Sequence, residues 1–224
     1  MNPMNLIPLT ATVAGLSMSA AASVVPFTET FSNDVSNWTA GSDAPLTFVE
    51  SGALDGSSYA TGSADLNTAG PFGLTLLRGE ASTNASDGAF VGNYLTGGIN
   101  RLEFDFRHDA GQDLNIALRV STPMNFPGFA VELNESVASG EWVTLSFDLF
   151  FGNPLITFEG PPSPMAFNGV MENVGNLQIS ANRPDGLSTP LNINFDLDNV
   201  RIVPAPSALA MLGLGGLVAT RRRR

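Results

Sequence analysis

The chain of 224 residues contains 21 acidic and 10 basic side chains, and it has no cysteine and no lysine. These counts exclude a disulfide framework, a thiolate nucleophile and a cysteine-ligated zinc site. Four of the ten arginines stand together near the C-terminus, so the rest of the chain carries 6 basic minus 21 acidic groups, a balance of −15. Such a surface argues against nucleic acid as a partner, because nucleic-acid binding needs cationic contacts with phosphate.

The beginning of the chain is typical of an export signal. Residues 6–25 form an apolar stretch rich in small side chains, and Ala20-Ala21-Ala22 offers the small residues that a signal peptidase requires. The first five residues carry no positively charged side chain, which departs from the usual start of such a signal. We expect residues 1–22 to be a signal peptide, followed by a single domain over residues 23–203.

Hydrophobic residues recur with a period of two along most of this domain. Leu102, Phe104 and Phe106, for example, alternate with charged residues. Such alternation places one face of a strand in a core and the other in water, as in antiparallel sheets. The ranges with this pattern are 27–31, 46–50, 73–78, 102–106, 114–120, 129–133, 143–149, 177–180 and 191–197.

Turn residues separate these ranges, as in Gly97-Gly98 and Asp109-Ala110-Gly111. The proline-rich segment 160–164 is expected to be a loop inside the domain, because strand patterns resume after it. No range has a convincing amphipathic-helix pattern. We therefore predict an all-β fold, a two-sheet antiparallel β-sandwich of the jelly-roll type.

Four aromatic residues are candidates for contact with sugar rings, since an aromatic face packs on a pyranose ring while nearby polar groups orient it. Trp38 and Trp142 adjoin predicted strands, which favours packing roles for both. Tyr59 and Tyr94 lie among glycine, serine and asparagine residues. These two tyrosines are the predicted ligand-binding residues, and a structural role is the alternative for each.

Two acidic segments are candidates for chemistry. The segment 103–108 approaches the Glu-x-Asp-x-x-Glu motif of concanavalin-like glucanases, with Glu103 and Asp105 on one strand face, but the second glutamate of that motif is His108 here. Because retaining hydrolysis needs two suitably spaced carboxyl groups, we expect no catalytic site. Asp109 and Asp113 form an acidic turn without the spacing of an EF-hand loop, and we expect a solvated hairpin there.

The last strand pattern is irregular. Its apolar residues are odd-numbered up to Leu197 and even-numbered at Val200 and Ile202. A regular strand cannot switch faces in this way. We therefore predict a β-bulge near Asp198-Asn199 that re-aims the Asp198 side chain.

Several sequence segments of the domain resemble those of the galactose-binding-like jelly rolls, which include many carbohydrate-binding modules. These segments are residues 27–31, 35–38, 140–145 and 195–202. The resemblance implies a structural calcium ion held between the first and last strands, with Glu29 and Asp198 as ligands and backbone carbonyls completing an oxygen shell. Glu29 alternates with two phenylalanines, where a carboxylate is costly unless it is paired or binds a cation. The alternative is that both acids are solvated.

The end of the chain combines Pro204-Ala205-Pro206, an apolar run at 208–220 and Arg221-Arg222-Arg223-Arg224. The run is short for a transmembrane helix, which needs roughly 20 residues, and the arginines would stay on the cytoplasmic side. The order resembles the PEP-CTERM sorting signal of exopolysaccharide-producing Gram-negative bacteria, with Ala205 where that family has glutamate. It implies a membrane-inserted segment that an exosortase-type enzyme processes.

These patterns predict an exported, non-enzymatic protein of the cell envelope, outer surface or extracellular matrix of a Gram-negative-type bacterium, associated with exopolysaccharide. A specific carbohydrate-binding module is the alternative, and a glucanase-like hydrolase is a third hypothesis. The expected partners are an exosortase-type enzyme, a glycan and, through the C-terminal segment, a membrane. The expected cofactor is structural calcium.

Overall fold

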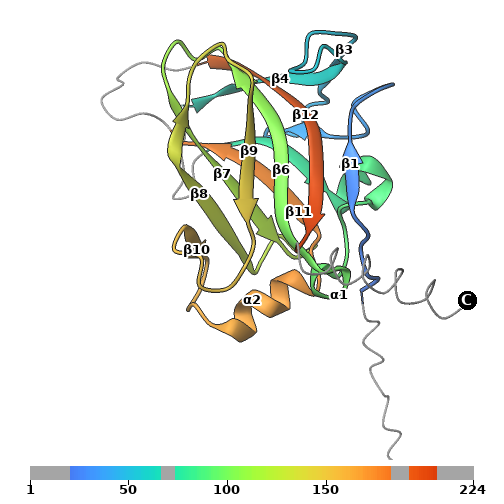
Figure 1. Ribbon diagram of the computed structural model, residues 1–224, viewed down its shortest axis with the longest axis vertical. Coiled ribbons are helices and arrows are strands. Elements are labelled where there is room, and N and C mark those ends of the chain that lie inside the picture. Colours follow the sequence, from blue (N-terminus) through green and yellow to red (C-terminus); the bar gives the residue numbers. More distant parts are fainter. Residues whose placement is uncertain (1–20, 67–73, 183–191, 206–224) are drawn as a thin grey trace, which may run out of the picture.

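The computed structural model describes residues 21–66, 74–182 and 192–205. In these ranges the chain forms two antiparallel β-sheets of six strands each, packed face to face, which confirms the predicted all-β sandwich (Figure 1). The predicted signal peptide and sorting signal lie almost entirely outside the described residues. Within them, no helix is long and apolar enough to span a membrane.

The first sheet is built around its longest strand, β12. Its order is β3 (Thr47–Val49), β4 (Tyr59–Asp65), β12 (Asn192–Pro204), β6 (Ile99–His108) and β9 (Val143–Asp148). On one side β12 pairs with β6, and on the other it pairs first with β4 and then with β1 (Phe27–Glu29). The first and last strands are therefore neighbours.

The second sheet lies behind the first. Its order is β10 (Ile156–Phe158), β8 (Gly128–Val137), β7 (Leu114–Ser121), β11 (Asn176–Ala181), β5 (Leu74–Glu80) and β2 (Thr39–Ala40). All of these pairs are antiparallel. The core between the sheets consists of the alternating residues that the sequence pattern marked, such as Phe104 of β6, which stacks on Phe147 of β9 at 5.2 Å between ring centroids. Full burial of such a side chain contributes about 1.5–3 kcal/mol.

The structure contains elements that the hydrophobic pattern did not indicate. β4 has the sequence Tyr-Ala-Thr-Gly-Ser-Ala-Asp, whose small residues give no clear alternation. The expectation of no helix was wrong, because α2 (Pro164–Met171) covers the lower end of the sandwich and the single turn α1 (Tyr94–Gly97) precedes β6 (Figure 1). The Ser163 hydroxyl accepts a hydrogen bond from the Ala166 N–H at 3.0 Å, and a proline at the first position completes this helix start.

The predicted bulge in the last strand is confirmed. Asp198 pairs with Asp105 and Arg201 with Glu103, so two residues of β12 stand opposite one residue of β6. The extra residue is accommodated at Asn199, whose φ is 50°. Asparagine tolerates this left-handed conformation better than most residues. The bulge restores the inward direction of Val200 and Ile202, which are both buried.

The outer face of the second sheet is polar yet largely covered. Arg119 on β7 donates to Glu159 Oε1 at 2.5 Å, to Gln178 Oε1 at 2.8 Å, and to Asn125 Oδ1 and O at 2.7 and 2.6 Å. Asn125 belongs to the loop between β7 and β8, so Arg119 holds that loop against the sheet. The Arg119 and Glu159 side chains are only 11% and 12% exposed. This ion pair is therefore a buried one.

Both ends of the described chain lie at the lower end of the sandwich, beside α1 (Figure 1). The Asn93 N–H donates to Ala22 O at 2.7 Å, just before α1. The Ala205 N–H donates to Gly98 O at 3.0 Å, just after it. The chain therefore enters and leaves the domain at the same place.

Candidate functional site

A hollow of about 540 Å³ lies between the loop that follows β1 and the 3-10 segment Ala85–Gly88. This volume falls in the range of small-molecule sites. Its lining consists mostly of hydroxyl, amide and carboxylate groups, contributed by Phe27, Glu29, Thr30, Ser32, Asn33, Asp34, Ser36, Asn37, Ser86, Asp87 and Ala89.

A chain of hydrogen bonds fixes the buried acid of this hollow. Glu29 Oε1 accepts from the Phe31 N–H at 2.9 Å, and Oε2 accepts from the Ser86 hydroxyl at 2.7 Å. Ser86 Oγ in turn accepts from Trp38 Nε1 at 2.9 Å. Trp38 is fully buried in the core, so the carboxylate is held in place from the interior of the domain.

The backbone around the hollow is held in uncommon conformations. Ser36, Asn37, Ser86 and Asp87 all line it, and their φ angles are 46°, 59°, 48° and 52°. Asparagine and aspartate tolerate this left-handed region, but it is unfavourable for serine. Such residues cost on the order of 1–3 kcal/mol each and gather at ligand sites, where the surrounding structure maintains them. The hollow is thus preformed.

The charges of the hollow have one sign. Three carboxylates, those of Glu29, Asp34 and Asp87, line it, and among the described residues no arginine, lysine or histidine does. A concave surface with this charge concentrates neutral or cationic ligands relative to anionic ones. Its abundant acceptors suit a ligand that is rich in hydroxyl donors.

The predicted ligand residue Tyr59 lies elsewhere, in an aromatic cluster on the outer face of the first sheet. Its ring centroid is 5.4 Å from that of Trp142, in an edge-to-face arrangement. Arg107 Cζ lies over both rings, at 5.4 and 4.8 Å from the centroids, and Arg107 Nη2 donates to the Tyr59 hydroxyl at 3.2 Å. Both rings are half-buried, so Tyr59 retains the exposure that ligand contact requires.

The prediction that Tyr94 contacts a ligand is wrong. Tyr94 is fully buried at the start of α1, and its hydroxyl donates to Phe90 O at 2.9 Å. Burial raises the pKa of Tyr94 above its ordinary value. The polar residues around it in the sequence form the turns on either side of a buried helical turn, which is why their composition resembled an exposed loop.

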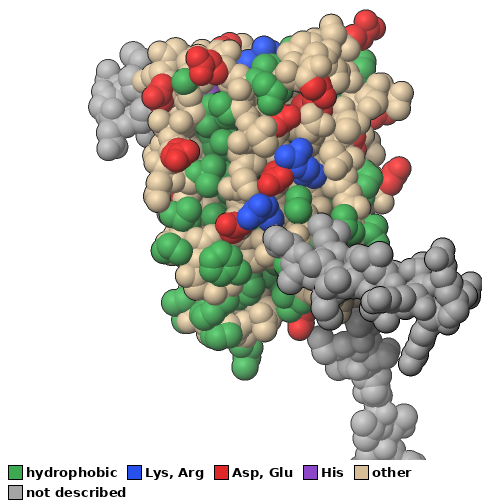
Figure 2. All heavy atoms as spheres, in the orientation of Figure 1, with side chains coloured by type: hydrophobic (Ala, Val, Ile, Leu, Met, Phe, Trp, Pro, Cys, Tyr) green, Lys and Arg blue, Asp and Glu red, His purple; other side chains and the backbone are tan. Residues whose placement is uncertain are grey.

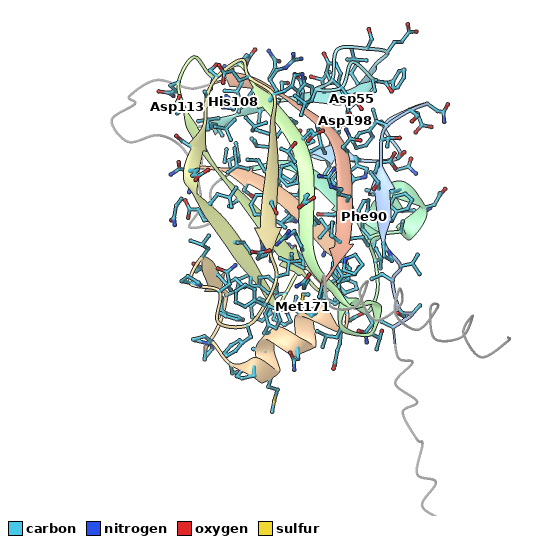
Figure 3. All side chains as sticks on the ribbon, in the orientation of Figure 1. Asp55, Phe90, His108, Asp113, Met171 and Asp198 are labelled. Carbon is cyan, nitrogen blue, oxygen red and sulfur yellow. The ribbon has the colours of Figure 1, made fainter. Side chains whose placement is uncertain are left out.

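The bulge brings Asp198 into a fully buried position beside two other aspartates. Asp198 Oδ2 accepts from the Ser57 hydroxyl and from Asn199 Nδ2, both at 3.1 Å, while Asn199 Nδ2 also donates to Asp105 Oδ2 at 2.9 Å. Figure 3 shows Asp55 next to Asp198. Burial raises the pKa of Asp198 to about 6, and the charges of Asp55 and Asp105 act in the same direction.

The predicted calcium ligands, Glu29 and Asp198, differ in the hydrogen bonds that their carboxylate oxygens accept. Both oxygens of Glu29 accept hydrogen bonds, whereas Asp198 Oδ1 is buried without a hydrogen-bond partner. An orphaned buried carboxylate oxygen fits the need for a cation. No group of three or more His, Cys, Asp or Glu side chains among the described residues is arranged to hold a metal ion.

The glucanase-like segment has structural partners. Glu103 Oε2 accepts from Arg201 Nε at 2.6 Å, and Asp105 Oδ1 accepts from the Thr144 hydroxyl at 2.5 Å. His108 is buried, and its Nε2 lies 3.0 Å from Val137 O. His108 therefore lies on the core side of β6, away from Glu103.

The remaining residues singled out in the sequence have structural partners or lie outside the described residues. Asp109 Oδ1 and Oδ2 accept from the Asn194 N–H and Nδ2 at 2.7 and 2.5 Å, which fastens the acidic hairpin to β12. Pro204 ends β12, and Ala205 is hydrogen-bonded to Gly98. Pro206, Arg221, Arg222, Arg223 and Arg224 lie outside the described residues.

Sequence reasoning missed the hollow. Two polar segments of its lining, Ser32-Asn33-Asp34 and Ser86-Asp87, lie more than fifty residues apart in the chain. Each has the composition of an ordinary turn. The available signal was their density of Asn, Asp and Ser, which favours left-handed turn conformations. Nothing in the sequence indicated that the two turns would meet.

Comparisons with known proteins show likeness of fold only. No family model and no curated protein matches the chain. The Clostridium thermocellum xylanase 10B CBM22-1–GH10 modules, solved with xylohexaose, share 16% identity at a TM-score of 0.49; the match covers 81% of this chain and 29% of that one. The C. thermocellum family 11 carbohydrate-binding module, solved with a β-1,3-1,4-mixed-linked tetrasaccharide, shares 12% sequence identity at a TM-score of 0.42. The match covers 82% of this chain and 98% of that one. The L4b domain of human laminin α-2 shares 9% sequence identity at a TM-score of 0.41, and the match covers 81% of this chain and 99% of that one.

Proposed function

We propose that this chain is an exported glycan-binding protein and that the hollow beside Glu29 is its binding site. The observation that supports the proposal is the lining itself, in which acceptor and donor groups surround a preformed space of about 540 Å³. Phe27, half-buried at the side of the hollow, supplies ring surface for the apolar face of a sugar. Such a combination of few apolar contacts and many oriented polar groups suits a polyhydroxylated ligand.

The proposed ligand is a neutral glycan, because the three carboxylates of the hollow would repel uronate or sulfate groups. The proposed activity is binding without catalysis. The carboxylates Glu29 and Glu103 each accept hydrogen bonds from residues of the domain, Glu29 from Ser86 and Glu103 from Arg201, which supports structural roles for both.

The proposed location is the cell envelope. The C-terminal apolar run and its four arginines would hold the chain in a membrane until an exosortase-type enzyme removes them, and the glycan would then be exopolysaccharide.

Conservative changes in the hollow should weaken glycan binding. Asp34→Asn together with Asp87→Asn keeps side-chain shape and tolerates the same backbone, but replaces two charged acceptors by weaker ones. We expect binding of a neutral oligosaccharide found on a glycan array to weaken about 5- to 100-fold, the equivalent of about 1–3 kcal/mol. Isothermal titration calorimetry measures this directly.

The matched control is Trp142→Ala, which removes the aromatic cluster on the outer face of the first sheet, whose residues do not line the hollow. If Trp142→Ala abolishes binding while the double asparagine variant binds normally, the site belongs at Tyr59 and the hollow is not the binding site. If no neutral glycan binds at all, the glycan-binding proposal is wrong.

We further propose that calcium binds at Asp198. Calcium at ten to a hundred times its dissociation constant should raise the free energy of unfolding by roughly 1.4–2.7 kcal/mol, because only the folded chain presents the site. Asp198→Asn should abolish this gain, and Glu29→Gln should retain it, since of these two residues it is Asp198 that has a buried oxygen without a donor. Urea unfolding in calcium and in EDTA tests this; identical curves for the wild-type protein would rule calcium out.

A further inference from the structure

Exposed hydrophobic side chains gather at one end of the sandwich. Of the eight large hydrophobic residues that are exposed in the described part of the chain, five come from the β7–β8 loop, the segment after β9 and the start of α2. These five, which we call the apolar end, are Met124, Phe126, Phe150, Phe151 and Met165. Figure 2 shows hydrophobic side chains over this lower end, while most acidic side chains in view lie higher.

The three segments of the apolar end are packed against one another. Phe151 lies 6.2 Å from both Phe158 and Phe167, measured between ring centroids, and the Glu159 N–H donates to Gly128 O at 3.2 Å beside the loop that carries Phe126. The tips nevertheless face outward. Met124, Phe126 and Met165 are 85%, 63% and 84% exposed. Clustered exposure of this kind marks a contact surface.

The course of the chain indicates what this surface meets. Ala205 is hydrogen-bonded to Gly98 at the same end, next to α1, and α1 contacts α2. Only Pro206 and Ser207 separate Ala205 from the apolar run at 208–220. Two residues span at most about 7 Å. A bilayer that takes up the apolar run therefore lies near this end of the sandwich.

We infer that the apolar end is a membrane-contact surface, which seats the domain upright on the lipid bilayer and inserts Met124, Phe126 and Met165 at headgroup depth. The inference deepens the proposed envelope location and rests on it for the placement of the run at 208–220. Apolar side chains of elements that lie on a bilayer are buried about 5–10 Å into the boundary between headgroups and acyl chains.

The charges of the domain indicate which lipids matter. Each arginine in the described ranges has a carboxylate within 2.5–3.2 Å, so none of them is left to attract an anionic headgroup. Contact at the apolar end is therefore hydrophobic in origin. It does not require anionic lipid, and salt does not weaken it.

Site-directed fluorescence on the full chain tests the inference. The chain has no cysteine, so a polarity-sensitive dye can be attached at one introduced residue at a time. Phe126→Cys and Met165→Cys report on the apolar end, Leu212→Cys on the C-terminal run, and Leu54→Cys, 49% exposed and remote from the apolar end, is the control. Each labelled protein is placed in phosphatidylcholine vesicles, with and without lipids that carry a quencher just below the headgroup.

We expect several-fold stronger quenching at residues 126 and 165 than at 54, unchanged when phosphatidylglycerol or salt is added. If the dye at residue 212 is quenched while the dyes at residues 126 and 165 are quenched no more than the dye at residue 54, the inference is overturned and membrane anchoring stands. Quenching at 126 and 165 without quenching at 212 would support the surface and contradict the anchor. Blue-shifted emission at 126 and 165 that lipid quenchers do not reach would show a protein cover and would overturn the inference.

Discussion

Replacing Trp38 with alanine should lower the free energy of unfolding by about 3–5 kcal/mol, the range for truncating a large buried aromatic residue. Trp38 makes edge-to-face contacts with Phe31 and Phe90, at 6.1 and 5.7 Å between centroids. It also donates to Ser86, which holds Glu29. Chemical unfolding monitored by circular dichroism measures the loss, and glycan binding in the hollow should weaken at the same time.

A partner variant makes this prediction specific. A Cβ atom built on Gly79 would lie 2.6 Å from the Trp38 ring, so Gly79→Ala should cost about 1–3 kcal/mol in the wild-type background. In the Trp38→Ala background the ring is gone and the same change should be nearly neutral. Additive losses in the double variant would mean that the two residues do not pack as described.

Arg119→Ala should be almost as damaging, with an expected loss of about 3–5 kcal/mol, because it leaves Glu159 buried without its counterion. It also releases Asn125, so the β7–β8 loop should become sensitive to limited proteolysis. Urea unfolding and the rate of cleavage in this loop are the two measurements.

The control here is Arg119→Met combined with Glu159→Leu. Replacing both charges by apolar side chains of similar volume removes the unpaired acid, and most of the stability should return. The loop should remain protease-sensitive in this double variant, since Asn125 still lacks its donor. Equal losses in the single and double variants would show that the cost does not come from an isolated Glu159 charge.

The sheet architecture was predictable because a strand with one wet and one dry face leaves its signature in local sequence. β6, with Phe104 and Phe106 alternating against charged residues, could be assigned from that signature alone. The bulge at Asn199 was equally visible, as a change from odd to even apolar positions. β4 was missed because it has few large apolar side chains to show an alternating pattern. Its small residues let neighbours pack closely on its backbone, as Leu46 and Phe195 do at Gly62.

The candidate site was not predictable in the same way. Asp198 could be predicted because the alternation of apolar residues breaks beside it. Ser86 lines the site because it donates a hydrogen bond to Glu29, which lies 57 residues away in the sequence, and no local pattern indicates that contact. Tyr94 shows the opposite error. Its polar neighbours suggested an exposed loop, but they cap a buried turn, and local composition cannot distinguish the two.

The position of β12 also has a mechanical consequence. Tension applied through the C-terminal segment enters the domain along the axis of a central strand, which β6 flanks on one side and β4 and β1 flank on the other. Antiparallel ladder bonds run perpendicular to the strands, so a pull along β12 shears many of them simultaneously. A pull on an edge strand would instead peel them apart one after another. A force applied to the C-terminal end of β12 would thus be shared by many hydrogen bonds at once.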